Sequence, residues 1–186
     1  MDYLDATGRY RSEQPAPQPP FTRDEAALLL GFLERQRATF AWKVGGLDEQ
    51  GLRRRLGTSD MTLGGMLKHL ARFEDDMSRE WLLGQEQVPP WSDVDWDADP
   101  AWDWRTGSEE SAAVLYARWQ EAVDRAREVF AAELTTGGRD MAEPGESSPS
   151  PRYVLLNMIE EYARHNGHAD LLRESVDGLV GHDPPE

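Results

Sequence analysis

The chain has 186 residues, of which 35 are acidic and 20 basic, giving a formal net charge of −15. This length suits one domain with a hydrophobic core. The acidic balance, without any block of Lys or Arg, argues against nucleic acid and membrane surfaces as partners. There is no cysteine, so a metal site would use His, Asp or Glu, and thiol chemistry would need an external thiol. The lack of a long apolar run or signal pattern predicts a cytoplasmic protein.

The N-terminal part of the chain differs in composition from the rest. Four prolines lie between residues 15 and 20, which predicts an extended or disordered arm over residues 1–21. A single helical domain is expected over residues 22–181, and residues 182–186 are expected to form a tail.

Two amphipathic segments follow the arm, each with apolar residues at helical intervals of three and four. Thr22 is predicted to cap the first helix, which Gly45-Gly46 ends. The second helix is predicted to begin near Asp60–Thr62 and to end at Gly84.

Two further helices are predicted in the second half of the chain. Ser108, followed by two glutamates, is expected to cap the third helix. Ser150 is expected to cap the fourth, with Pro151 at its first position and Gly178 near its end. Four such segments without strand-like alternation predict an all-α protein, specifically a four-helix bundle. The long second and third connections leave both an up-down-up-down topology and a crossover topology open.

The connection between the second and third predicted helices, Gln85–Gly107, is unusually long for a small domain. It contains four tryptophans, namely Trp91, Trp96, Trp102 and Trp104. These side chains could simply hold the connection against the bundle. Alternatively, one or two of them could form a wall of a substrate pocket.

Three histidines carry the main chemical signal. A helix turns 100° per residue, so Glu161 and His165 project from one face of the fourth helix, and His168 follows on that face. His69 lies in the second helix. A buried carboxylate needs a cation, a hydrogen-bond network or solvent. One divalent ion bound by His69, Glu161 and His165 would satisfy all three groups, and helical bundles build metal sites in this way.

Other interpretations fit the same spacing. Glu-x-x-x-His pairs arise by chance on helices, so these side chains could be ordinary packed or surface residues. His168 could be a ligand itself, but the helix rises roughly 10 Å between Glu161 and His168, which is long for one small ion. His168 is therefore predicted to orient a ligand or to act as a general base beside the metal.

Two stretches resemble a known superfamily. Thr62–Glu74 (TLGGMLKHLARFE), with Trp81 and Pro89-Pro90-Trp91, resembles the second helix and crossover loop of the DinB superfamily. Asn157–Glu174 (NMIEEYARHNGHADLLRE) resembles its last conserved helix. The resemblance covers about Phe21 to Gly181 and points to an actinobacterial branch related to mycothiol-dependent enzymes.

The resemblance implies an up-down-down-up four-helix bundle with a divalent metal. The usual superfamily ligands are three histidines, and Glu161 replaces one of them here. The mycothiol-dependent maleylpyruvate isomerase branch also uses a His/Glu/His set, which implies His69, Glu161 and His165 as ligands. Zinc and nickel both suit nitrogen and carboxylate ligands.

The resemblance also implies thiol chemistry. Known activities in the superfamily transfer a small thiol such as mycothiol to an electrophile, or isomerise a substrate through a thiol adduct. The metal would bind the thiol and lower its pKa. A non-catalytic metal-binding or stress-related bundle protein and a metal-assisted hydrolase are the alternatives. The protein is expected to be a monomer or a homodimer.

Overall fold

The computed structural model describes residues 2–11, 17–136, 141, 143 and 148–181. Every secondary-structure element within these residues is a helix. The only β contact there is an isolated bridge between Leu4 and Tyr10. The predicted all-α class is therefore confirmed. None of the helices in this part of the chain is both long and apolar enough to cross a bilayer.

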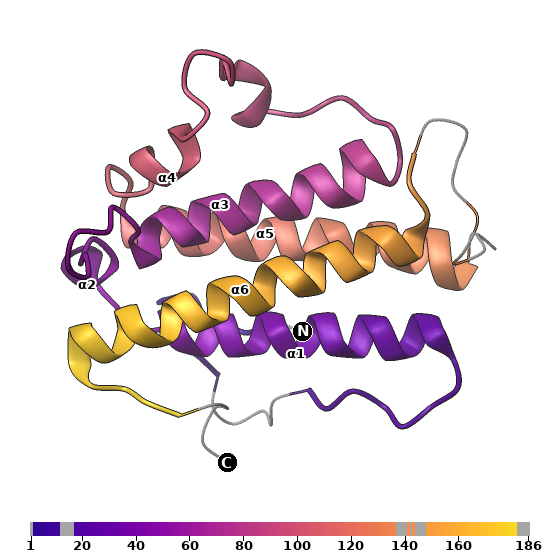
Figure 1. Cartoon of the computed structure of the whole chain (residues 1–186), viewed down its shortest axis with the longest axis horizontal. Coiled ribbons are helices and arrows are strands. Elements are labelled where there is room, and N and C mark those ends of the chain that lie inside the picture. Colours follow the sequence, from indigo (N-terminus) through magenta and orange to yellow (C-terminus); the bar gives the residue numbers. More distant parts are fainter. Residues whose placement is uncertain (1, 12–16, 137–140, 142, 144–147, 182–186) are drawn as a thin grey trace.

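Four long helices form the bundle, namely α1 (Glu25–Val44), α3 (Leu63–Asp75), α5 (Ala112–Phe130) and α6 (Pro151–Asp177). Short π-helices extend two of them: η1 (Asp76–Trp81) follows α3 and η3 (Ala131–Thr136) follows α5. In Figure 1, α1 and α6 run in one direction, while α3 and α5 run in the other. The order is thus up-down-down-up. The most extensive contacts are between the parallel partners, α1 with α6 and α3 with α5.

The parallel arrangement of α3 and α5 explains the long connection between them. A chain that leaves one end of α3 must return along the bundle before it can start α5 in the same direction. Residues 82–111 make this crossover and contain η2 (Trp91–Asp93) and α4 (Trp102–Thr106). α4 packs against α3. A shorter helix, α2 (Glu49–Leu52), lies between α1 and α3 in the sequence.

The ends of α6 follow the sequence signals. The Ser150 hydroxyl accepts a hydrogen bond from the backbone N–H of Tyr153, and Pro151 occupies the first turn, where its missing N–H has no cost. At the other end, Gly178 adopts φ +80°, a left-handed conformation that glycine adopts readily.

Two predicted caps were misplaced. α1 begins after Asp24, whose carboxylate accepts the Ala27 N–H, and the Thr22 hydroxyl, two residues earlier, instead accepts the Asp24 N–H. α5 begins after Ser111 rather than Ser108. Ser108 belongs to the turn that ends α4, where its hydroxyl donates to the Arg105 carbonyl. Ser108 and Ser111 both precede helix-forming residues, so local sequence alone does not show which of them caps α5.

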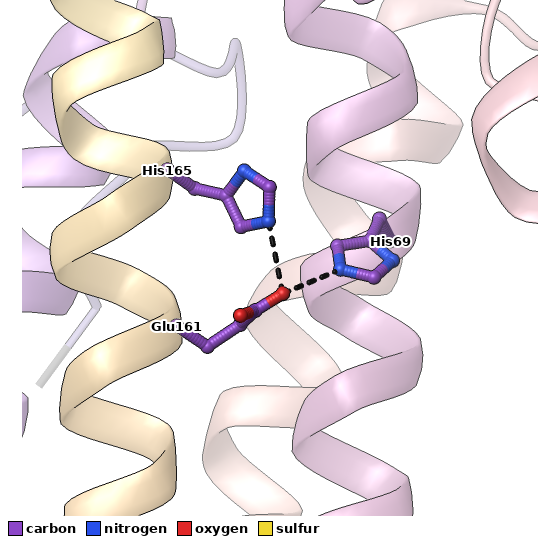
Figure 2. Close-up of side chains that lie close together, drawn as sticks. All are labelled: His69, Glu161 and His165. Atoms are coloured by element: carbon purple, nitrogen blue, oxygen red, sulfur yellow. Dashed lines mark hydrogen bonds and ion pairs between the residues drawn. The ribbon is translucent and has the colours of Figure 1, made fainter.

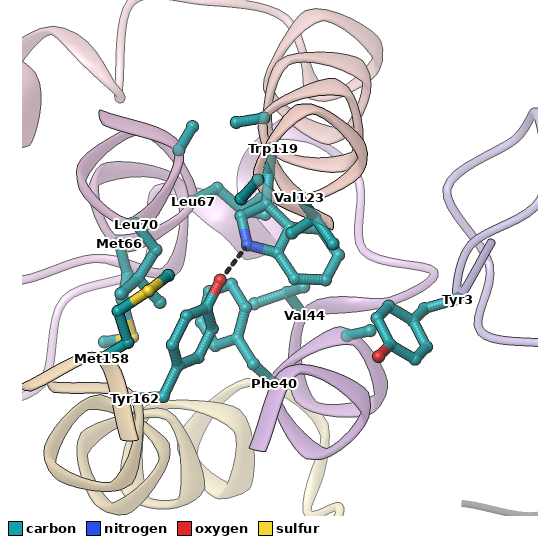
Figure 3. Close-up of a cluster of buried hydrophobic side chains, with 14 of the residues drawn as sticks. Tyr3, Phe40, Val44, Met66, Leu67, Leu70, Trp119, Val123, Met158 and Tyr162 are labelled. Carbon is teal, nitrogen blue, oxygen red and sulfur yellow. Dashed lines mark hydrogen bonds between the residues drawn. The ribbon is translucent and has the colours of Figure 1, made fainter. Parts of the chain in front are cut away.

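The first residues of the chain pack onto the bundle. Tyr3 and Leu4 are buried, and the Tyr3 hydroxyl donates to the backbone oxygen of Glu34 at 3.1 Å. The beginning of the predicted arm (residues 1–21) therefore contributes Tyr3 and Leu4 to the core of the domain, and Figure 3 shows Tyr3 there. The predicted tail, residues 182–186, lies outside the described residues.

A buried polar network runs through the apolar core. The Arg37 Nε donates to Glu74 Oε1 at 2.7 Å, and both side chains are almost completely inaccessible to solvent. The Tyr162 hydroxyl donates to the same carboxylate at 2.6 Å, and Trp119 Nε1 donates to the Tyr162 oxygen at 2.9 Å (Figure 3). Burial, together with the Glu74 charge, raises the pKa of Tyr162. These residues come from α1, α3, α6 and α5, so the network links all four helices.

We predict that Glu74→Ala destabilises the protein by about 3–5 kcal/mol, because it removes the fully buried partner of the Arg37 guanidinium and leaves only Glu34, 2.6 Å from Nη1, as a counter-charge. Chemical denaturation of the purified variant measures this change. Glu121→Ala is the matched control, because Glu121 is on α5 with a 69% exposed side chain and lies 4.0 Å from Arg125. The control should stay within about 1 kcal/mol of the wild type. A similar small effect for both variants would show that the buried ion pair is not essential to the bundle.

Candidate metal centre

His69 on α3 faces Glu161 and His165 on α6 (Figure 2). The Glu161 Oε1 lies 3.1 Å from His69 Nε2 and 3.0 Å from His165 Nε2. One nitrogen or oxygen atom from each of the three side chains lies within 4.8 Å of the other two. The structure thus brings together the three residues that the sequence placed around one ion.

The three donor atoms fit a small divalent cation. Atoms that share an ion at about 2.0–2.2 Å lie roughly 3–4 Å from one another, and the two distances from Glu161 fall in that range. Two imidazoles and one carboxylate are a common donor set for a divalent transition-metal ion. It also leaves coordination positions for a further ligand.

The centre is only slightly accessible to solvent. The side chain of His165 is 6% exposed, and those of His69 and Glu161 are 18% exposed. Hydrogen bonding to His165, and then to His69, holds the pKa of Glu161 far below its usual range, so this side chain is a carboxylate at neutral pH. Burial disfavours the charged form of His69, but its contacts with Asp103 and Glu161 outweigh burial and raise its pKa.

Asp103 on α4 is a part of the centre that the sequence analysis did not identify. Its Oδ2 lies 2.9 Å from His69 Nδ1, on the side of the ring opposite the nitrogen that faces Glu161. Burial alone would raise the pKa of Asp103, but the hydrogen bond to His69, the His69 charge, the Trp104 N–H and the Arg72 charge together outweigh burial and lower the pKa. Helical periodicity could not reveal this contact, because it depends on the path of the crossover. The unusual length of that connection was the one available signal.

The tryptophans of the crossover have two different environments. Trp104 stacks on His69, with ring centroids 4.4 Å apart and planes inclined by 25°, and its ring centroid is 5.2 Å from that of His165. Trp91 is buried, and its Nε1 donates to Asp75 at 2.8 Å. Trp104 therefore forms a wall of the candidate metal centre, whereas Trp91 holds the connection against α3.

His168 lies next to the candidate ligands. Its Nδ1 is 3.4 Å from His165 Nδ1, the ring nitrogen that points away from Glu161. Burial and the neighbouring His165 lower the pKa of His168, so the ring is neutral at neutral pH and can accept a proton. Its position is compatible with a role in orienting His165 or in proton transfer.

The bundle topology and the His/Glu/His cluster together define a DinB-like helical protein with a candidate metal centre. The sequence matches the family model described as Mycothiol-S-transferase over residues 28–178, which is most of the chain. The chain belongs to this family, and its resemblance to the DinB superfamily is confirmed. No curated protein in the comparison matches it.

We predict that His69→Ala removes most of the bound metal, because the cluster loses its only donor from α3. The chain should keep its fold, since the His69 side chain is partly exposed. Elemental analysis of purified protein measures the metal content, and chemical denaturation measures stability.

Leu172→Ala is the contrasting variant. Leu172 is 3% exposed, and its truncation leaves a core cavity that costs roughly 2–5 kcal/mol. This variant should retain metal when folded. Metal retention by His69→Ala would show that His69 is not a ligand.

Proposed function

We propose that this protein is a divalent-metal-dependent thiol S-transferase that uses mycothiol as its co-substrate. The convergence of His69, Glu161 and His165 carries the proposal, because this donor set suits a metal ion that leaves room for a thiol. The family match supports the choice of mycothiol over other thiols. Zinc and nickel are the proposed metals. We also propose a cytoplasmic location, where small thiols stay reduced.

In this proposal, His69, Glu161 and His165 hold the ion, and Trp104 covers one side of the two imidazoles. A divalent ion supplies positive charge that favours thiolate over thiol at neutral pH. The low exposure of the centre strengthens this electrostatic effect, because less water is present to screen it.

His168 is the proposed general base. The neutral ring can accept the proton that the thiol loses, and its contact with His165 keeps it beside the metal centre. The thiol sulfur then forms a bond to an electrophilic carbon, and the leaving group departs with its electron pair. Isomerisation through a thiol adduct would need the same thiolate, whereas a hydrolase or a non-catalytic metal-binding protein would not.

We predict that the metal-loaded protein conjugates mycothiol to monochlorobimane faster than the uncatalysed reaction. Each turnover forms a carbon–sulfur bond and releases chloride, and the fluorescence of the product gives the rate. Removal of the metal with a chelator should abolish the enhancement, and added zinc or nickel should restore it. A protein that binds metal at full occupancy but accelerates no conjugation with mycothiol or other thiols would favour the non-catalytic alternative.

We predict that His168→Ala keeps nearly full metal occupancy but lowers turnover by about 10²–10⁴-fold, the usual contribution of a general base. The loss should be largest near neutral pH, where an imidazole exchanges protons. Glu160→Ala is the control, because its 69% exposed side chain lies on the same helix. Loss of metal in His168→Ala, with retention in Glu161→Ala, would show that the α6 ligands are wrongly assigned.

A further inference from the structure

We propose that Asp103 is a positioning residue, which fixes the tautomer and the orientation of the His69 ring. In this way the crossover connection would control the metal affinity of a centre whose ligands all lie on α3 and α6. The inference rests on the proposed function, because it assigns His69 the role of a ligand.

The hydrogen bond between the two side chains defines the tautomer. A carboxylate carries no proton at neutral pH, so it only accepts hydrogen bonds. The 2.9 Å contact between Asp103 Oδ2 and His69 Nδ1 therefore places a proton on Nδ1. Nε2 faces Glu161 Oε1 at 3.1 Å, so without a metal it can carry a proton toward that carboxylate. A metal ion would take the place of that proton, while the bond to Asp103 keeps the other proton on Nδ1. Without this acceptor, the ring could place its proton on Nε2 and block the donor atom.

Asp103 is itself held firmly in place. Its side chain is 1% exposed, and its Oδ1 accepts the backbone N–H of Trp104 at 2.9 Å. Arg72 Nη1 lies 3.5 Å from Oδ2, and the Arg72 guanidinium lies 3.5 Å from the centre of the Trp96 ring. Trp104 in turn stacks on His69. The imidazole is thus restrained at its edge by Asp103 and across its face by Trp104.

Glycines explain how so short a side chain reaches His69. A Cβ added to Gly107, just after α4, would lie 2.5 Å from the Cα of Gly65 on α3. A Cβ on Gly65 would lie 2.8 Å from the backbone oxygen of Trp104. The backbones of the two elements therefore approach each other more closely than any larger residue allows. This contact lies one helical turn before His69 on α3.

The first test is Asp103→Asn, which preserves shape but removes the charge. An amide can donate as well as accept, so His69 becomes free to place its proton on Nε2. We expect the affinity for zinc, measured by competition with a chromophoric chelator, to fall about 10–100-fold. Asp99→Asn is the matched control, since Asp99 lies in the same crossover and pairs with Arg105 instead. Its affinity should equal that of the wild type. Unchanged zinc affinity in folded Asp103→Asn would overturn the proposal.

The second test detects the proton on His69 Nδ1 directly, by ¹⁵N NMR of the histidine rings in the metal-free protein. In the wild type, His69 Nδ1 should carry a proton, and Asp103→Asn should show a population that lacks it. A wild-type ring without a proton on Nδ1 would overturn the inference, even if the variant did not fold. This readout does not depend on metal. A wild type that binds neither zinc nor nickel would instead contradict the proposed function.

Discussion

The buried ion pair between Arg37 and Glu74 is the interaction on which the geometry of the bundle depends. Both side chains are removed from water, so each charge requires the other in a fixed position. Tyr162 donates to the same carboxylate, which fixes the rotation of α6 about its axis. Glu161 immediately precedes Tyr162 on that helix, and this rotation directs it toward α3 and His69. The core network and the candidate metal centre are thus consequences of one arrangement of α3 and α6.

The crossover connects the topology to the chemistry. Because α3 and α5 are parallel, the chain must pass along the outside of α3 before α5 begins. That path brings Asp103 to His69 Nδ1, the ring nitrogen that points away from Glu161, and places Trp104 against the rings of both His69 and His165. The crossover is long because it must return the chain to the end of the bundle where α3 began. Its residues Asp103 and Trp104 contact His69, a proposed metal ligand on α3. The parallel arrangement of α3 and α5 therefore accounts both for the length of the crossover and for its contacts with the candidate site.

The sequence predicted those features that follow from local rules. The apolar periodicity and the Ser150–Pro151 start are properties of single helices, so the helical class and α6 were correctly predicted. Helical spacing also placed Glu161 beside His165. The contacts of Asp103 and the pairing of Glu74 with Arg37 were not predictable, because each joins elements whose relative position is set by the whole fold. The choice of Ser111 over Ser108 as a cap likewise depends on where α4 ends.

The central claim is that one divalent ion binds among His69, Glu161 and His165. The most direct measurement is a crystal structure of the zinc-loaded protein with anomalous diffraction recorded on both sides of the zinc absorption edge. We expect one anomalous peak per chain, bonded to His69 Nε2, Glu161 and His165 Nε2, with Asp103 still hydrogen-bonded to His69 Nδ1. A zinc ion bound elsewhere on the acidic surface, with these three side chains left without a peak, would contradict the account.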